Sequence, residues 1–420
     1  MSSGMSAKVA ATSPVTSRAA VWRRFRWALI PIGIFLLTRV ADAIMLMIAV
    51  RHQYPASNFP GFGVPIIRDP HTYSNVVQSW DGQWFRLIAE DGYPHTLPTS
   101  HGQVVESQWG FYPLFPALVR LVMVVTHTSF GVAASILNLV LGSAGMCVFY
   151  RLISSRASGF SAVMAVVVAS TFPSAVVFQT AYSEALCFLL LVSAIWFLGR
   201  RQYAWLMLIG VLLSLTRPIV LPLALVVAIH GWLRWRARDR EPFPVRDRWW
   251  VAVTAAVVAA SFELWSVAGW IITGDPHTYV TAIGAWNRAS GKNAQLGSDS
   301  WLTHALTGDS QALVAIVLAV GLQCYLLLRR PARLWTPELR AWSFAYAAYL
   351  LLTTWPQSSV VRHLLMVLVP TWPWPEVGDR ITDRRRQILL ATAVGAVGLV
   401  LQFFWINKFW IDGSSFYSFP

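Results

Sequence analysis

The residues best suited to chemistry lie in one acidic and aromatic stretch, S-W-D-G-Q-W-F-R-L-I-A-E-D-G-Y, which runs from Ser79 to Tyr93. Aromatic faces stack on sugar rings and a carboxylate accepts a hydroxyl proton, so Asp81 between Trp80 and Trp84 could be a general base beside a bound sugar. A structural interpretation is equally open. Tryptophan is common at membrane surfaces, and an acid at the start of a helix stabilises that helix.

Further charged residues stand beside long apolar runs, where an unpaired charge is costly and therefore marks a candidate functional site. Arginine and histidine there would suit the phosphate of a lipid carrier through charge-assisted hydrogen bonds. Pairing of the arginines with a carboxylate such as Glu184, or snorkelling of their long side chains, is the structural alternative. The candidates for phosphate binding are Arg217, Arg362 and His363, and those for other substrate contacts are Trp80, Trp84, Glu90, Trp109, Tyr112, Tyr182, Glu184 and Asp275.

Sequence motifs for other chemistries are absent. The chain has no Walker-type phosphate loop, no H-E-x-x-H and no G-x-S-x-G. The adjacent acids Glu90 and Asp91 alone are weak evidence for a metal, so we expect no metal and no cofactor. Arg39 and Asp42 are three residues apart in an apolar run and are expected to neutralise each other.

Composition places the chain in a lipid bilayer, because 56% of its 420 residues are hydrophobic and only 12% are charged. Soluble proteins carry about twice that charged fraction. The net charge of +14 is distributed in short tracts between apolar runs, which indicates membrane topology rather than nucleic-acid binding. Arginine greatly outnumbers lysine, which favours a GC-rich source such as an actinobacterium.

The apolar runs predict an all-α protein with about eleven transmembrane helices, each near the 17 to 25 residues that a crossing commonly needs. The segment 113–126 is short and contains two prolines and Arg120, and we interpret it as an interfacial or re-entrant helix. The predicted spans are 27–50, 130–150, 159–179, 183–199, 203–216, 219–233, 249–273, 310–328, 341–355, 360–374 and 388–410.

Basic residues set the orientation, since short cytoplasmic loops accumulate them. With the N-terminus inside, most of the 33 basic residues become cytoplasmic. Two long loops, 51–129 and 274–309, then lie outside, and such loops are usually functional. The predicted organisation is a cytoplasmic tail (1–26), one transmembrane domain (27–410) with an extracytoplasmic active site in a cell membrane, and a C-terminal tail (411–420).

Several motifs occur together in the order found in one family. They are W-D-G-Q-W-F with I-A-E-D-G-Y (Trp80 to Tyr93), F-Y-P-L-F-P (Phe111 to Pro116), the run from Phe172 to Leu186, L-T-R-P (Leu215 to Pro218), T-G-D-P with W-N-R (Thr273 to Arg288), and V-V-R-H-L-L around Arg362. In these motifs the chain resembles the PIG-V-like mannosyltransferases, relatives of the GPI mannosyltransferase that adds the second mannose. It departs from them where eukaryotic members often have histidine, at or near Trp84.

The resemblance implies a GT-C-type fold, a catalytic acid at Asp81, and transfer of mannose from a polyprenyl-phosphate donor to a glycolipid or glycan acceptor. Two alternatives stay open. Another polyprenyl-phosphate sugar, for example arabinofuranose, could be the donor, because no residue visibly selects the sugar. A transporter of lipid-linked sugars is the non-enzymatic alternative, and it would favour inverted repeats and charges at the membrane midplane.

Overall fold

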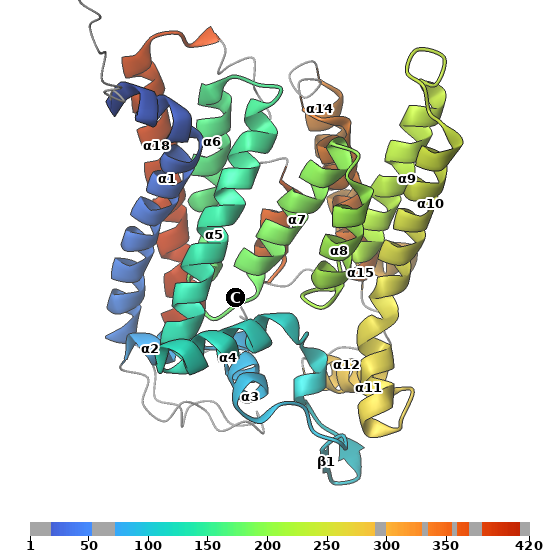
Figure 1. Cartoon of the computed structure of the whole chain (residues 1–420). Coiled ribbons are helices and arrows are strands. Elements are labelled where there is room, and N and C mark those ends of the chain that lie inside the picture. Colours follow the sequence, from blue (N-terminus) through green and yellow to red (C-terminus); the bar gives the residue numbers. More distant parts are fainter. Residues whose placement is uncertain are drawn as a thin grey trace, which may run out of the picture.

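The computed structural model describes residues 18–52, 72–289, 300–329, 335–354, 359–368 and 380–411. These residues are almost entirely helical, which confirms the all-α prediction (Figure 1). Their strands are one two-residue pair, β1 (Thr99–Ser100) and β2 (Gln103–Val104).

The long helices stand side by side and form the body of the molecule (Figure 1). Five of them are long and apolar enough to cross a membrane: Phe25–Val50, Phe130–Ser154, Val245–Thr273, Ser310–Leu328 and Arg384–Trp410. The helices of the body are α1 (Arg18–Val50), α5 (Phe130–Ser154), α6 (Gly159–Ser170), α7 (Glu184–Gly199), α8 (Tyr203–Ser214), α9 (Val220–Arg236), α10 (Val245–Ala260), which continues through Ser261–Glu263 into α11 (Leu264–Thr273), α14 (Ser310–Leu328), α15 (Pro337–Thr353) and α18 (Arg384–Ile406).

The described parts of the two long loops gather at one end of this body, the lower end in Figure 1. There α4 runs across the ends of the long helices, and at 1.5 Å per residue its 13 residues reach only about 20 Å, too little to cross a bilayer. The elements of the two loops are α2 (Tyr73–Val77), α3 (Asp81–Asp91), η2 (Gln108–Gly110), α4 (Leu114–Thr126), α12 (Thr278–Ala289) and α13 (Trp301–Leu306).

Predicted and observed helix bounds differ in several places, and three of the differences involve breaks near proline or a left-handed residue. The helix predicted over 159–179 ends at Ser170, because Pro173 disfavours helical backbone at Phe172 and supplies no N–H. The one predicted over 203–216 ends at Ser214, shortly before Pro218. Over 360–374 the described part comprises the short α16 (Val360–Leu364) and a 3-10 turn (Leu365–Val367), after which Leu368 has a φ of 69° that ends the helix.

The ion pair predicted inside the first span forms, and it holds three segments together. Arg39 contacts Asp42, and the two side chains are 2% and 0% exposed. Arg39 also donates to the carbonyls of Ala175 and Ser170, and Asp42 accepts from Gln402 of α18. Because each charge has partners, this buried pair can stabilise the packing of α1 against its neighbours.

Candidate active site

Four charged side chains that are distant in sequence meet at the loop end of the helix bundle. Asp81 Oδ2 lies 2.6 Å from Arg362 Nη1. Arg362 Nε lies 3.1 Å from Glu184 Oε1, and the same carboxylate oxygen is 2.5 Å from Arg217 Nη2. The result is a continuous chain of alternating charge, Asp81–Arg362–Glu184–Arg217, which we call the charge network.

The network carries two negative and two positive charges, and its burial is uneven. The Asp81 side chain is 29% exposed, whereas Glu184 is 1% exposed. Glu184 Oε2 is buried without a hydrogen-bond partner among the described residues. Asp81 is thus the member that water or a substrate reaches most easily, and Glu184 is held inside by the two arginines.

Asp81 is the first residue of α3, and a close contact between backbones fixes this end of the helix. Gly82 lies so near the next segment that an added Cβ would be 3.3 Å from Ala181 Cβ. Ala181 N donates to Val77 O at 2.7 Å, just before the helix begins. Trp84, Phe85 and Ile88, which follow one another at helical spacing, are buried on one face of α3.

Glu184 begins α7 directly after an irregular segment, 171–183, which we call the buried connection. Irregular backbone among apolar helices needs partners for its polar groups. Asn138 of α5 supplies two of them, donating to Thr180 O at 2.5 Å and to Tyr182 O at 2.9 Å. Ser135, one helical turn earlier, donates to Gln179 O at 3.0 Å. One face of α5 therefore holds the segment that carries Glu184.

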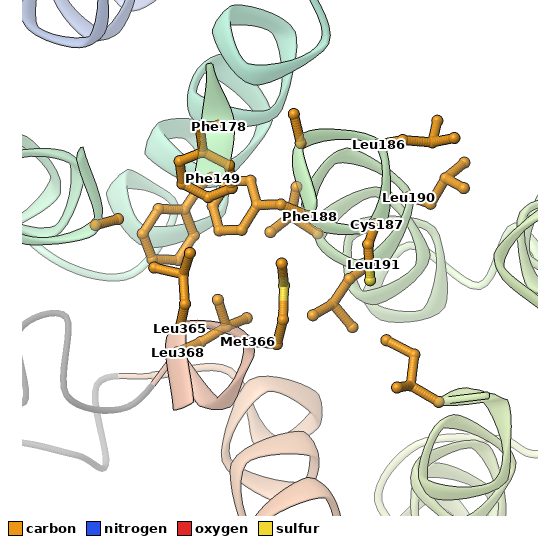
Figure 2. Packing of buried hydrophobic residues seen from close by; sticks show 14 of the residues in the cluster. Phe149, Phe178, Leu186, Cys187, Phe188, Leu190, Leu191, Leu365, Met366 and Leu368 are labelled. Atoms are coloured by element: carbon orange, nitrogen blue, oxygen red, sulfur yellow. The ribbon is translucent and has the colours of Figure 1, made fainter. Parts of the chain in front are cut away.

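Arg362 is positioned by the short turn that follows it. Ser174 donates to Val361 O at 3.1 Å, and Trp342 donates to Met366 O at 2.8 Å. Figure 2 shows Leu365, Met366 and Leu368 facing Phe149, Phe188 and Leu191 of α5 and α7. These apolar contacts anchor the turn that follows α16. They therefore fix the position of the Arg362 guanidinium in the charge network.

Tyr182 and Arg217 complete the surroundings of the network. The ring centroid of Tyr182 lies 5.1 Å from the Arg362 guanidinium carbon, within the range of a cation–π interaction. Its hydroxyl donates to Ser79 O at 3.2 Å, next to the start of α3. Arg217 Nε donates to Ser183 Oγ at 3.2 Å. His363 follows Arg362 in α16 and is half-buried.

Besides Tyr182, three of the predicted aromatic residues pack in the protein interior. Trp109 is fully buried, and its indole N–H donates to Pro94 O at 2.9 Å. Tyr112 is hydrogen-bonded to Tyr279 at 2.8 Å, and Trp84 meets Trp286 with ring centroids 4.9 Å apart. Because Tyr279 and Trp286 belong to α12, these side chains join the second long loop to the first.

The predicted acids Glu90 and Asp275 lie apart from the charge network. Glu90 is at the far end of α3 from Asp81, roughly 13 Å along the helix axis, and its exposed carboxylate is 3.8 Å from Arg86. Asp275 Oδ1 accepts the backbone N–H of His277 at 2.8 Å in an exposed turn before α12. Among the described residues, no group of three or more His, Cys, Asp or Glu side chains is arranged to hold a metal ion.

Comparisons with known proteins give matches in structure alone. No protein-family model matches the sequence, and no curated protein matches it. A crystal structure of the Archaeoglobus fulgidus oligosaccharyltransferase, in complex with Zn and sulfate, matches with a TM-score of 0.44 and 14% identity over 90% of this chain and 53% of that chain. The same enzyme tethered by a disulfide bond to an acceptor peptide matches with a TM-score of 0.41 and 13% identity over 95% and 56%. This chain thus spans about half the length of the oligosaccharyltransferase.

Two residues that the sequence analysis did not single out contribute to the site. Asn138 is one, and its signal was available, since it is an isolated amide inside an apolar run and such residues are usually functional or paired. Trp410 is the other, and its indole N–H donates to Val76 O at 3.1 Å, just before α3. Nothing local in the sequence distinguishes Trp410 from the many tryptophans at membrane surfaces.

Proposed function

We propose that the protein is a membrane glycosyltransferase that moves mannose from a polyprenyl-phosphate donor to a glycolipid or glycan acceptor. The observation that carries the proposal is the charge network, in which the partly exposed Asp81 contacts Arg362 and the buried Glu184 contacts both Arg362 and Arg217. It lies at the end of the bundle where the long loops gather. Transfer from a sugar phosphate needs a base for the acceptor and cations for the leaving group, and this network contains both.

Asp81 takes the role of general base. The acceptor hydroxyl oxygen attacks the anomeric carbon of the donor, the bond from that carbon to the phosphate oxygen breaks, and the hydroxyl proton passes to Asp81. One such displacement inverts the anomeric centre, so a β-linked donor gives an α-mannoside. A positioned base typically contributes about 10²-fold to 10⁴-fold.

Arg362, Arg217 and His363 take the role of stabilising the departing phosphate. Fixed cations in a site with little water stabilise developing negative charge more strongly than water does. Arg362 is 9% exposed and Arg217 is 16% exposed, so both are largely shielded from solvent.

The proposed setting is a GT-C-type, PIG-V-like enzyme of a bacterial cell membrane with its N-terminus in the cytoplasm. The two long loops then face the outside, where lipid-linked sugars and glycan acceptors meet. This orientation is supported by the basic tracts in the connections at the opposite end of the bundle, such as Arg234 to Arg248 between α9 and α10.

The test is sugar transfer in membranes of a deletion strain that carries wild type, Asp81→Asn or Asp91→Asn. Asp91 lies on the same helix as Asp81 but at its exposed far end, so it is the matched control. With radiolabelled polyprenyl-phosphate mannose, wild type and Asp91→Asn should form a mannosylated product, and an equally abundant Asp81→Asn should lose at least about 100-fold.

Equal transfer by wild type and Asp81→Asn would refute the base assignment. If wild type itself transfers no mannose, the same assay with a polyprenyl-phosphate pentose tests another donor of this class. Failure of every polyprenyl-phosphate sugar would refute the proposed reaction.

A further inference from the structure

The end of α18 turns into a short π-helix, Asn407–Ile411, that contacts the backbone leading into α3. Trp80 donates its indole N–H to Phe409 O at 3.0 Å. In the opposite direction, Trp410 donates its indole N–H to Val76 O at 3.1 Å. Two hydrogen bonds thus join this π-turn to the residues just before Asp81. Such turns occur frequently at functional sites.

Trp80 has backbone angles that a residue with a side chain rarely adopts. Its φ is 58° and its ψ is −120°, which are the angles of the first central residue of a type II′ turn, a position that glycine normally occupies. The turn is closed by Gly82 N, which donates to Ser79 O at 3.2 Å. Strain of this kind persists only when the surroundings hold it.

The same π-turn reaches the other side of the charge network. Trp410 is 4% exposed, and its ring centroid lies 6.1 Å from that of Tyr182, the ring beneath Arg362. Trp405 packs on Trp410 at 5.4 Å and fixes it from the side of α18. One segment therefore contacts both the turn that carries Asp81 and the aromatic ring that supports its arginine partner.

We infer that this π-turn is a positioning element, which keeps Trp80 in its strained conformation and thereby aims the Asp81 carboxylate at Arg362 and the acceptor. The inference rests on the proposed function, since it assigns to Trp80 and Trp410 the task of orienting the proposed base. Neither residue is assigned a contact with the reacting atoms. Misplacing a reacting group by about 1 Å can cost about 100-fold in rate.

The decisive comparison is between alanine and glycine at position 80. Both remove the indole, but glycine adopts the observed φ and ψ without strain and alanine does not. Trp80→Ala should therefore lower kcat about 100-fold, whereas Trp80→Gly should retain at least about ten times the kcat of Trp80→Ala. A role in packing alone predicts the reverse order, because alanine fills more space.

Trp410→Phe tests the π-turn itself, since phenylalanine keeps an aromatic ring but cannot donate to Val76 O. It should lower kcat about tenfold, with the KM for the donor within about twofold of wild type because the arginines are intact. Trp270→Phe is the matched control, because Trp270 of α11 is 53% exposed, and it should behave as wild type.

A chain ending at residue 411 keeps the π-turn, and one ending at residue 406 removes it. Only the second should lose transfer.

Asp81→Asn, measured beside these variants, separates the two ideas. If Asp81→Asn transfers normally, the proposed function fails and the inference fails with it. If Asp81→Asn is inactive while Trp410→Phe and both substitutions of Trp80 match wild type in kcat, the inference alone is overturned. It is also overturned if Trp80→Ala is as active as Trp80→Gly. Membrane abundance and thermal stability of each variant identify any loss caused by unfolding.

Discussion

Replacing Glu184 with glutamine should destabilise the protein more than replacing Asp81 with asparagine, although both changes remove one carboxylate from the charge network. Glu184 is 1% exposed and compensates two guanidiniums, whereas Asp81 is 29% exposed and contacts one. Removing one partner of a buried ion pair costs about 3–5 kcal/mol, because the other charge stays buried. Water reaches Arg217, which is 16% exposed, so we expect the lower end, about 3 kcal/mol, for Glu184→Gln.

Asp81→Asn should cost only about 1 kcal/mol, since Arg362 keeps its contact with Glu184 and water solvates part of the vacated position. The measurement is unfolding of the purified proteins in one detergent, with Glu241→Gln as the control. Glu241 pairs with Arg201 on the surface, and its loss should leave stability unchanged. The double variant Glu184→Gln/Arg217→Gln removes one charge of each sign and should be more stable than Glu184→Gln alone.

A different order of stabilities would refute this account. If Glu184→Gln is as stable as wild type, the two arginines do not depend on it. If Asp81→Asn is less stable than Glu184→Gln, the burial of each carboxylate does not determine how much its removal destabilises the protein.

Three further changes test the supports of the site. Asn138→Leu leaves two carbonyls of the buried connection without donors and should destabilise the protein by about 2–6 kcal/mol, measured by thermal unfolding. Gly110→Ala places a methyl group 2.5 Å from Trp286 Nε1 and should cost about 1–3 kcal/mol and change tryptophan fluorescence, whereas Gly33→Ala, which meets no atom within 4 Å, should do neither. Burial raises the pKa of Tyr93, so its contribution to stability is complete below about pH 10 and is lost as pH rises further; Tyr93→Phe should reduce the alkaline loss seen in unfolding at pH 9 and pH 11.

Local periodicity predicted several elements because their causes are local. Apolar runs form helices close to the predicted ranges, for example α7 (Glu184–Gly199) at 183–199, and the short segment 113–126 contains α4, which runs across the ends of the long helices. The sequence analysis did not predict that α6 ends at Ser170 and α8 at Ser214. Pro173 and Pro218, which follow these ends closely, were the available signals. The pairing of Arg217 with Glu184 was one of two interpretations that the sequence left open.

The contact between Asp81 and Arg362 could not be predicted in the same way, since 281 residues separate them. It depends on how the turn after α16, Leu365 to Leu368, packs against α5 and α7, which the order of residues alone does not determine. Residue type also did not distinguish aromatic side chains that could bind a sugar from those that pack in the core. Trp109 has the chemistry of a sugar platform, but its fully buried ring instead packs against Tyr93 and Trp265.

The ion pair between Asp81 and Arg362 constrains any mechanism in which Asp81 is the base. Asp81 Oδ2 already accepts a charge-assisted hydrogen bond from Arg362 Nη1 at 2.6 Å, so this oxygen is occupied when no substrate is bound. The pair must therefore loosen before the acceptor hydroxyl is deprotonated, and the donor phosphate is the group in the proposed reaction that can compete for Arg362. Glu184 remains beside Arg362 throughout and limits how far the guanidinium moves. An enzyme built in this way frees its base only after the donor has bound, so the donor should bind before the acceptor.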